Sequence, residues 1–320
     1  MKLSSSVVIS LSLFVFNTSF PAIAGLINLG TANDYNVFIH QNFSATSSDV
    51  EGRMAVGGDI NISHYSVNIK NGSQLYTDTS DSPALVAGGD LNFKSGQIAG
   101  DVHVGGTYTP TSSGNVVNGS ANIGAPALID FDAEFNNLIN LSTSLSLLSP
   151  NAVAEDQFST QYLTGAGANN LENDMHIFSL DSSDMLFSDY LLSNVDKGDT
   201  VLFNVSGTDI STSWGNFGGS DFSLDIMSEN IIFNFYEAEA LHLNASLYGS
   251  ILAPKADITA PTGVIWGQVI ANSWDGNMQI NDNPFVNTSV KVPEPSSLII
   301  FFLGLIALCV KREAKGYLSL

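Results

Sequence analysis

Short apolar segments separated by pairs of glycines recur in the first third of the chain. The segment Met54–Ile62 reads Met-Ala-Val-Gly-Gly-Asp-Ile-Asn-Ile, and Leu85–Phe93 and Val102–Thr109 repeat its order of apolar run, Gly-Gly and second run. Weaker echoes follow at Gly249–Ile258 and Gly267–Asn272. A lone unit of strand, turn and strand cannot bury its apolar side, so the repeats predict a β-solenoid with uneven coils. The glycines are expected at positive φ, which other residues adopt only with strain.

A different period appears between Pro126 and Pro150. Acidic residues near its start complement a helix dipole, and these are Asp130, Asp132 and Glu134. Apolar residues recur there mostly every three or four positions, as in an amphipathic helix: Leu128, Phe131, Phe135, Leu138, Ile139, Leu145 and Leu148. The pattern predicts one long helix at about 127–148 that packs on the solenoid through Phe131, Phe135 and Leu138.

Strand-like segments return after this helix. They lie at Met175–Leu180, Thr200–Val205, Asp221–Ile226 and Asn230–Tyr236, and coil-like repeats resume from Leu241 to Ile280. The predicted fold class is therefore mainly β: a discontinuous β-helix (solenoid) with one long α-helix packed along its side. Early and late segments are expected to share one core.

Residues 1–24 have the organisation of a secretory signal peptide. Lys2 precedes the apolar stretch Val7–Phe20, and the small residues Ala22 and Ala24 stand before Gly25, where signal peptidase is expected to cut. An N-terminal membrane helix is the alternative interpretation. Residues 25–288 would then form the solenoid domain.

Residues 289–320 contain a second targeting pattern. Pro293, Glu294 and Pro295 precede the apolar run Leu298–Val310, which ends at Lys311 and Arg312. As a helix this run would span about 20 Å, short for a hydrocarbon layer of about 30 Å, and the basic pair is expected to stop its end in the cytoplasm. An ordinary tail anchor with an incidental Pro-Glu-Pro is the alternative.

The charge balance limits the partners of the chain. Ten Lys and Arg stand against 31 Asp and Glu, and charged residues make up only 13% of the chain, so the polar surface is mostly Ser, Thr, Asn and Gly. Such a surface binds phosphate weakly, which argues against a nucleic-acid partner. The one cysteine, Cys309, lies in the C-terminal apolar run, so we expect neither a disulfide framework nor a cysteine metal site.

Two pairs of charged residues in the repeats are candidates for binding. Glu51 and Arg53 would share one face of a strand and could hold a sugar or a carboxylate, although pairing with neighbours is the simpler interpretation. Asp59 and Asp90 each follow a Gly-Gly pair and could form a calcium ladder. The nonapeptide that builds such ladders is absent, which favours an aspartate that stabilises the turn.

No motif gives positive support for catalysis or a cofactor. The five histidines are far apart in sequence, which makes a zinc site improbable: His40, His64, His103, His176 and His242. Neither a nucleophile elbow nor a complete dinucleotide fingerprint occurs, so we expect a non-enzymatic protein without cofactor or metal. A carboxylate pair for glycoside hydrolysis stays open, because 31 acids always provide a pair somewhere.

Threonines and aromatic residues suggest two further surfaces. The segment Thr107–Thr111 carries threonine at alternate positions, like one row of an ice-binding face, but the other repeats do not continue this row. Trp214, Trp266, Trp274 and Tyr248 could stack on sugar rings, or they could close the ends of the core.

Two resemblances follow from these motifs. Val292–Arg312 resembles the PEP-CTERM sorting signal of Gram-negative bacteria, which implies processing by an exosortase; Tyr317–Leu320 extend past the usual basic stop. The body from Leu29 to Pro284 resembles the choice-of-anchor A family, through the motifs at Tyr35–Phe38, Ser48–Asp59, Val205–Gly207, Gly249–Ala256 and Gly267–Asn272 with Pro284-Phe285. That family is similar to ice-binding-like adhesive domains, which implies a β-helix with one long helix along its side.

The sequence thus predicts an exported, adhesin-like protein of the cell surface or extracellular matrix. Its expected partners are signal peptidase, the exosortase, transiently the inner membrane, and exopolysaccharide or a cell-surface glycan. The alternative is a secreted polysaccharide lyase or hydrolase on a β-helix. A groove with convergent charged residues would favour the enzyme, whereas a flat face of Ser, Thr and Asn would favour adhesion.

Overall fold

The structure is a computed structural model that describes residues 27–70, 82–110, 115–167, 174–213, 216–218 and 230–286. These residues all belong to one compact unit, Leu26–Val290, of the two into which the chain divides. The predicted signal peptide with its cleavage site, the Pro-Glu-Pro motif, the apolar run 298–310 with its basic pair, Trp214 and the segment Asp221–Ile226 lie outside the described residues. No helix in the described ranges is long and apolar enough to cross a membrane.

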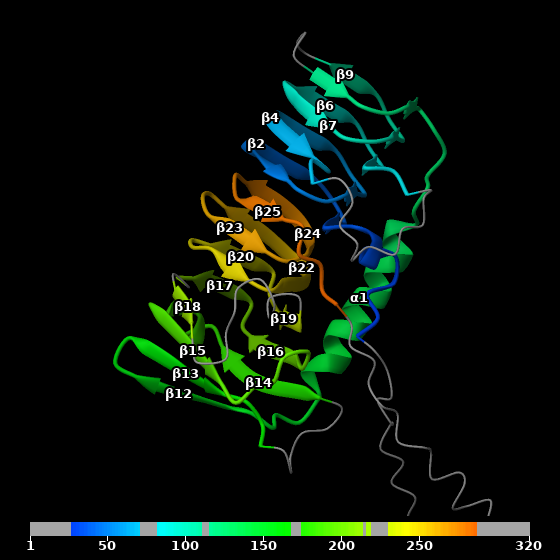
Figure 1. Cartoon of the computed structure of the whole chain (residues 1–320). Coiled ribbons are helices and arrows are strands. Elements are labelled where there is room, and N and C mark those ends of the chain that lie inside the picture. Colours follow the sequence, from blue (N-terminus) through cyan, green and yellow to red (C-terminus); the bar gives the residue numbers. More distant parts are fainter. Residues whose placement is uncertain are drawn as a thin grey trace, which may run out of the picture. The chain divides into compact units, whose positions relative to one another are not determined.

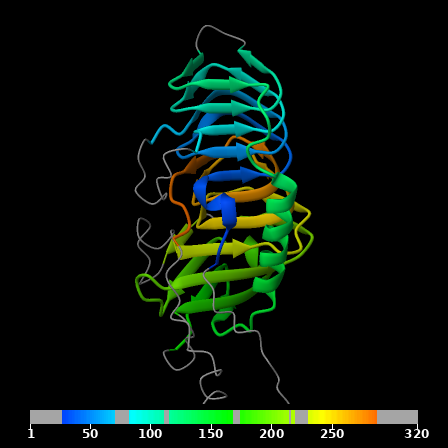
Figure 2. The same cartoon turned by 90° about the vertical axis from the view of Figure 1, so that its right-hand side faces the viewer.

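The described strands form a parallel β-solenoid with three faces, as Figures 1 and 2 show. One α-helix, α1 (Phe131–Ser146), lies along its side, and two short 3-10 helices are η1 (Gly30–Asp34) and η2 (Asp184–Leu186). The predicted fold class is confirmed.

The face under α1 is named the helix-covered face. Its strands lie in parallel register with one another. They are β14 (Met175–Asp181), β16 (Thr200–Ser206), β19 (Ile231–Asn234), the first halves of β22 (Ser250–Ala260) and β24 (Val269–Gly276), β1 (Val37–Ile39), β3 (Met54–Val56), β5 (Leu85–Ala87), β8 (Val102–Val104) and β11 (Ala121–Ile123).

The second face is named the polar face. Its strands again pair in parallel. They are β17 (Asp209–Thr212), β20 (Ala240–Leu243), the second halves of β22 and β24, the first halves of β2 (Phe43–Val50) and β4 (Ile60–Val67), β6 (Leu91–Lys94) and β9 (Tyr108–Pro110).

The third face completes the coils. It consists of β21 (Leu247–Tyr248), β23 (Val264–Trp266), β25 (Gln279–Asn281), the second halves of β2 and β4, β7 (Gly96–Ile98) and β10 (Asn115–Val117). A separate four-stranded sheet contains β12 (Val153–Gln157), β13 (Thr160–Thr164), β15 (Asp189–Ser193) and β18 (Asn216–Gly218). Its β12 and β13 form the one antiparallel pair among the described strands.

The coils do not follow one another in chain order. Strand β1 pairs with β3 on one side and with β24 on the other, so Val37 lies between Met54 and Val269. In Figure 1 the orange late strands accordingly lie next to the blue early ones. The early coils extend from β1 to β11, α1 returns along the side, and the late coils extend from β14 back to β1. The predicted discontinuity, with early and late segments in one core, is confirmed.

Helix α1 begins after Asp130, whose Oδ1 accepts the N–H of Ala133 at 3.1 Å and so caps the first turn. Phe135 and Leu138 are buried as predicted, together with Leu145, and Phe131 is half-buried. The predicted span of about 127–148 was too long, since residues 127–129 precede the capped start. The helix packs on outward apolar side chains of the helix-covered face: Phe38, Ala55, Val86, Leu202, Ile232, Leu252 and Ile270.

The paired glycines have a different role from the predicted one. None of the three pairs at Gly57, Gly88 and Gly105 has a positive φ, so the reason given by sequence analysis was wrong. A Cβ at Gly88 would instead overlap the carbonyl of Gly57 on the preceding coil, and one at Gly105 would overlap the carbonyl of Gly88. Glycine is required here because successive coils stack backbone on backbone at this corner.

Candidate binding face

The polar face carries a continuous row of outward polar side chains. Strand alternation buries one neighbour of each, for example Phe43, Ile60 and Leu91, in the core. The pairing register places the row on eight successive coils, in the order Ser211, His242, Thr259, Asp275, Ser44, Asn61, Asn92 and Thr109. At the usual strand spacing of about 4.8 Å, the row is about 34 Å long.

Hydrogen bonds between coils hold several of these side chains in place. Asn92 Nδ2 donates to Asn61 Oδ1 at 2.8 Å, and His242 Nδ1 lies 2.7 Å from Thr259 Oγ1. His242 Nε2 lies 3.3 Å from Asp209 Oδ1 in the neighbouring coil. Contacts between neighbouring coils therefore hold part of the row in a fixed arrangement.

Two shallow depressions lie along the row. The first has a volume of about 570 Å³ and is lined by residues that include Ser211, His242 and Thr259. The second, of about 470 Å³, is lined by Ser44, Asn61 and Asn92 among others, and Asp275 and Asn277 border both. Among the described lining residues the one carboxylate is Asp275 and the one amine is Lys94. This lining is rich in hydroxyls and amides rather than in convergent charges.

Asp59 and Asp90 lie on successive coils, as the ladder hypothesis required, but their carboxylates bind backbone. Asp59 Oδ1 accepts the N–H of Asp90 at 2.8 Å, and Asp90 Oδ1 accepts the N–H of Thr107 at 2.7 Å. The backbone N–H and side-chain hydroxyl of Thr107 hold the pKa of Asp90 below its usual range. Asn42 begins the series by accepting the N–H of Asp59 at 2.8 Å. The geometry supports the turn-stabilising interpretation.

Glu51 and Arg53 do not share a strand face, because residues 51–53 form a bend between β2 and β3. That part of the prediction was wrong, since the strand must turn into the next coil there. Glu51 Oε2 lies 3.3 Å from Lys70 Nζ and accepts the N–H of Asp282 at 3.0 Å. Burial raises the pKa of Asp34, and the nearby charge of Arg53 opposes this rise. Both side chains thus interact with neighbours.

The described aromatic candidates do not point outward on the polar face. Trp274 is 2% exposed and stacks on Phe43 in the core, with ring centroids 5.9 Å apart. Trp266 and Tyr248 are half-buried on the third face and stack with centroids 6.1 Å apart. A common sugar platform for these three residues is therefore not formed.

The five histidines lie in separate places. His40 contacts Asp132 of α1, His64 contacts Ser63, His103 contacts the carbonyl of Pro126, and the buried His176 contacts Asp199. In the part of the chain that the structure describes, no group of three or more His, Cys, Asp or Glu side chains could hold a metal ion.

Sequence analysis missed most of the outward row. Asn61, Asn92 and Thr109 occupy the same position after each Gly-Gly pair, so aligning the repeats could have found them. Ser211, His242, Thr259 and Asp275 come from late coils without that pair, and only the pairing register brings them into line. Of the predicted threonine row, Thr109 joins the polar row, Thr107 lies at the corner and Thr111 is outside the described residues.

Comparisons with known proteins complete the description. Residues 28–282 match a family model for an ice-binding-like adhesive domain, and residues 291–313 match the PEP-CTERM protein-sorting motif. A search of curated proteins gives no match.

Among solved structures, an ice-binding protein of the Antarctic ascomycete Antarctomyces psychrotrophicus is 14% identical, with a TM-score of 0.43 over 82% of this chain and 100% of that chain. An ice-binding protein from an Antarctic biological consortium is 13% identical, with a TM-score of 0.42 over 87% and 96%. The DUF3494 domain of Shewanella frigidimarina ice-binding protein 1 is 10% identical, with a TM-score of 0.40 over 81% and 97%.

Proposed function

The chain belongs to the ice-binding-like adhesive domain family, and on that premise we propose that it is an exported, non-enzymatic surface protein that attaches to polysaccharide through its polar face. The observation that carries the proposal is the outward row on eight coils, from Ser211 to Thr109. Hydroxyls and amides that stand about 4.8 Å apart can share hydrogen bonds with the hydroxyls of an extended sugar chain.

The composition of the row favours sugar over ice or acidic polymer as the ligand. Thr259 and Thr109 are the two threonines among the eight residues, whereas a flat ice-binding face needs the same row coil after coil. Asp209, Asp257 and Asp275 add negative charge on the late coils, which opposes an acidic polymer. A neutral polysaccharide fits this surface best.

A glycan array with the exported protein tests this proposal. Asn92 and Gln97 are both exposed uncharged amides, and they lie on successive strands β6 and β7 on different faces. Asn92→Leu should weaken binding about fivefold, because one hydrogen bond contributes about 1 kcal/mol. The matched control Gln97→Leu should leave binding unchanged. Equal binding by both variants, or an array without any bound glycan, would contradict attachment through the polar face.

The C-terminal motif defines a second part of the function. A PEP-CTERM motif implies that the chain is an exosortase substrate that is exported and passes through the membrane during processing. We infer that Pro293, Glu294 and Pro295 are read outside the inner membrane while Lys311 and Arg312 stay inside.

Substitution of the motif carboxylate tests the sorting step in the native host. Glu294→Ala should accumulate a longer, membrane-retained form, whereas Glu313→Ala, the same change after the basic pair, should be processed normally. The readout is the mass of the protein and its extraction from membranes. If the Glu294→Ala protein has the same mass as wild type and is extracted from membranes in the same way, the sorting proposal is wrong and an ordinary tail anchor explains the C-terminal run.

A further inference from the structure

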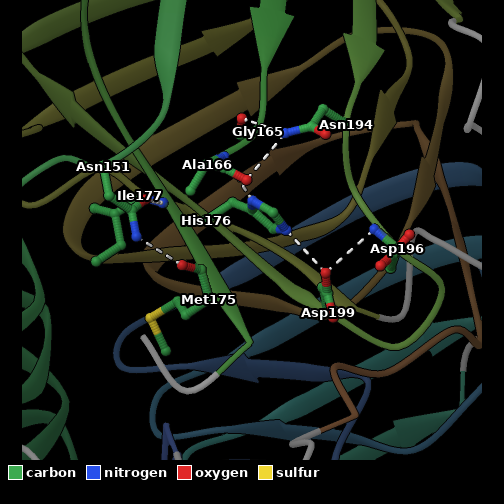
Figure 3. A network of polar contacts seen from close by, with 9 residues as sticks. All are labelled: Asn151, Gly165, Ala166, Met175, His176, Ile177, Asn194, Asp196 and Asp199. Carbon is green, nitrogen blue, oxygen red and sulfur yellow. Dashed lines mark hydrogen bonds and ion pairs between the residues drawn. The ribbon is translucent and has the colours of Figure 1, made fainter. Parts of the chain in front are cut away.

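The two ends of the solenoid are built differently. At the far end of the helix-covered face, Asn151 covers the edge of β14. Its side chain accepts the N–H of Ile177 at 2.7 Å and donates to the carbonyl of Met175 at 3.0 Å, and its backbone N–H donates to Ile177 at 3.1 Å (Figure 3). His176 and Asn194 bind the neighbouring Gly165 and Ala166 segment, through Ala166 N and the two carbonyls. On the helix-covered face, the edge of the solenoid is therefore covered by its own chain.

The opposite end is formed by β9, β10 and β11. Among the described strands each of these pairs with one neighbour only, namely β6, β7 and β8. An edge of this kind presents backbone groups to which another strand can bind.

Apolar side chains that continue the core are exposed at this end. Ile123 continues the inward row of Val104, Ala87 and Val56, yet it is 42% exposed, whereas those three residues are buried. Ala121, in register with the buried Val102, is exposed as well. The last coil thus presents apolar side chains along the solenoid axis.

This end lacks the charges that protect other parts of the chain. The net charge is −21, but no Asp, Glu, Lys or Arg occurs from Val102 to Ile129. Natural edge strands are usually protected by charged residues or proline, and here Pro110 protects β9 alone. Elsewhere the acidic surface of two copies would repel. The last coil itself carries no charged side chain, and the nearest carboxylate, Asp101 on the preceding coil, accepts the N–H of Ser120 at 2.7 Å.

We propose that this end binds the same end of a second copy of the chain, with β11 pairing against β11 of the other copy. A two-fold axis brings the same surface together from both sides and makes the paired strands antiparallel. It would pass near Asn122, the middle residue of β11, and place Ile123 against Ala121 of the other copy. A two-fold contact uses the same end of both copies, so assembly stops at a dimer.

Cysteine cross-linking of the full chain, expressed in its native host cells, tests the dimer. Cys309→Ser first removes the only cysteine of the sequence. In that background, Asn122→Cys places one thiol from each copy next to the two-fold axis. The two thiols can then form a disulfide, which requires Cβ atoms about 3.5–4.5 Å apart. Mild oxidation should convert the Asn122→Cys protein into a covalent dimer. The control Asn61→Cys, exposed on the polar face, should stay monomeric.

A charged residue introduced at the proposed contact provides a second test of the dimer. Ile123→Glu in the Asn122→Cys protein should reduce cross-linking about tenfold, whereas Asn92→Glu on the polar face should not. Protease resistance of each variant shows that its solenoid is intact. Cross-linking of Asn122→Cys no stronger than that of Asn61→Cys, or unchanged by Ile123→Glu, would overturn the proposal.

Discussion

The helix-covered face and the polar face use the same parallel ladder and differ in what points outward. Strand β22 contributes to both, with Leu252 outward under α1 and Thr259 outward on the polar face. Strand β24 does the same with Ile270 and Asp275. The core on the inner side is apolar in both cases. The outward residues, every second one along a strand, therefore decide whether a face is covered by the helix or stays exposed to solvent.

The polar contacts differ in the same way. On the helix-covered face, the buried Asn204 and Asn234 bind the helix backbone, through the carbonyls of Leu145 and Ser142, each at 2.8 Å. On the polar face, Asn61 and Asn92 bind each other and keep the rest of their amides exposed. Asparagine thus fixes the contact between helix and solenoid in one region and forms part of an exposed polar surface in the other.

The largest expected loss of stability comes from removing a buried aromatic side chain between α1 and the solenoid. Phe135 is 1% exposed and stacks on Phe38 with ring centroids 5.5 Å apart. Phe135→Ala should lower the free energy of unfolding by about 3–5 kcal/mol, because the residues around such a cavity fill it only in part. The exposed Asn137→Ala on the same helix is the control and should change stability by less than about 0.5 kcal/mol. Denaturant unfolding measures both, and a loss as small as that of the control would place α1 free in solvent.

Strand β22 allows the two faces to be compared within one element. Leu252→Ala should cost about 2–5 kcal/mol because Leu252 is fully buried under α1. Thr259→Ala should stay within about 1 kcal/mol, because Thr259 is exposed and loses only its contact with His242. Similar melting temperatures for the two variants would show that the helix does not turn this face into an internal layer.

The corner between the faces should respond to an added side chain. A Cβ at Gly89 would overlap the Asp59 carboxylate and press on the Gly58 backbone, so Gly89→Val should cost about 1–3 kcal/mol. A Cβ at Gly167 would meet no described atom within 4 Å, so Gly167→Val serves as the control. If thermal unfolding finds both variants equally stable, coil stacking does not restrict this corner.

The smallest expected effect is the acid sensitivity of the same corner. The pKa of Asp90 is lowered in the folded protein by its bonds to Thr107, so the unfolded chain takes up this proton first as the pH falls. The stabilisation is complete above the unfolded value of about 3.9 and is lost as the pH falls through the folded pKa. Asp90→Asn should therefore flatten the stability curve below about pH 4, measured by urea unfolding. A curve parallel to that of wild type would remove Asp90 from the corner bonds.

Much of the fold could be predicted from periodicity, and much of the site could not. The three- and four-residue spacing around Phe135 located the helix, and the Gly-Gly repeats located the early coils, because both patterns are local. The row from Ser211 to Thr109 depends on pairing between coils that are distant in sequence, which no local pattern contains. Glu51 and Arg53 were predicted to lie on a strand, whereas they lie in a bend at the corner of a coil. Such a bend has no repeating pattern of apolar and polar residues by which the sequence could reveal it.

The pairing of β1 with β24 also bears on the order of folding during export. Asn36, just before β1, donates to the carbonyl of Gly267, which lies 231 positions later in the sequence. The contact between β1 and β24 therefore closes a loop that contains most of the described chain. Contacts of such separation form late, because the loop must lose its entropy before they are gained. Each half can build coils as it emerges, but the seam between the halves waits for β24. We therefore expect kinetics with a slow final phase, during which the facing edges of β1 and β24 are open to other chains.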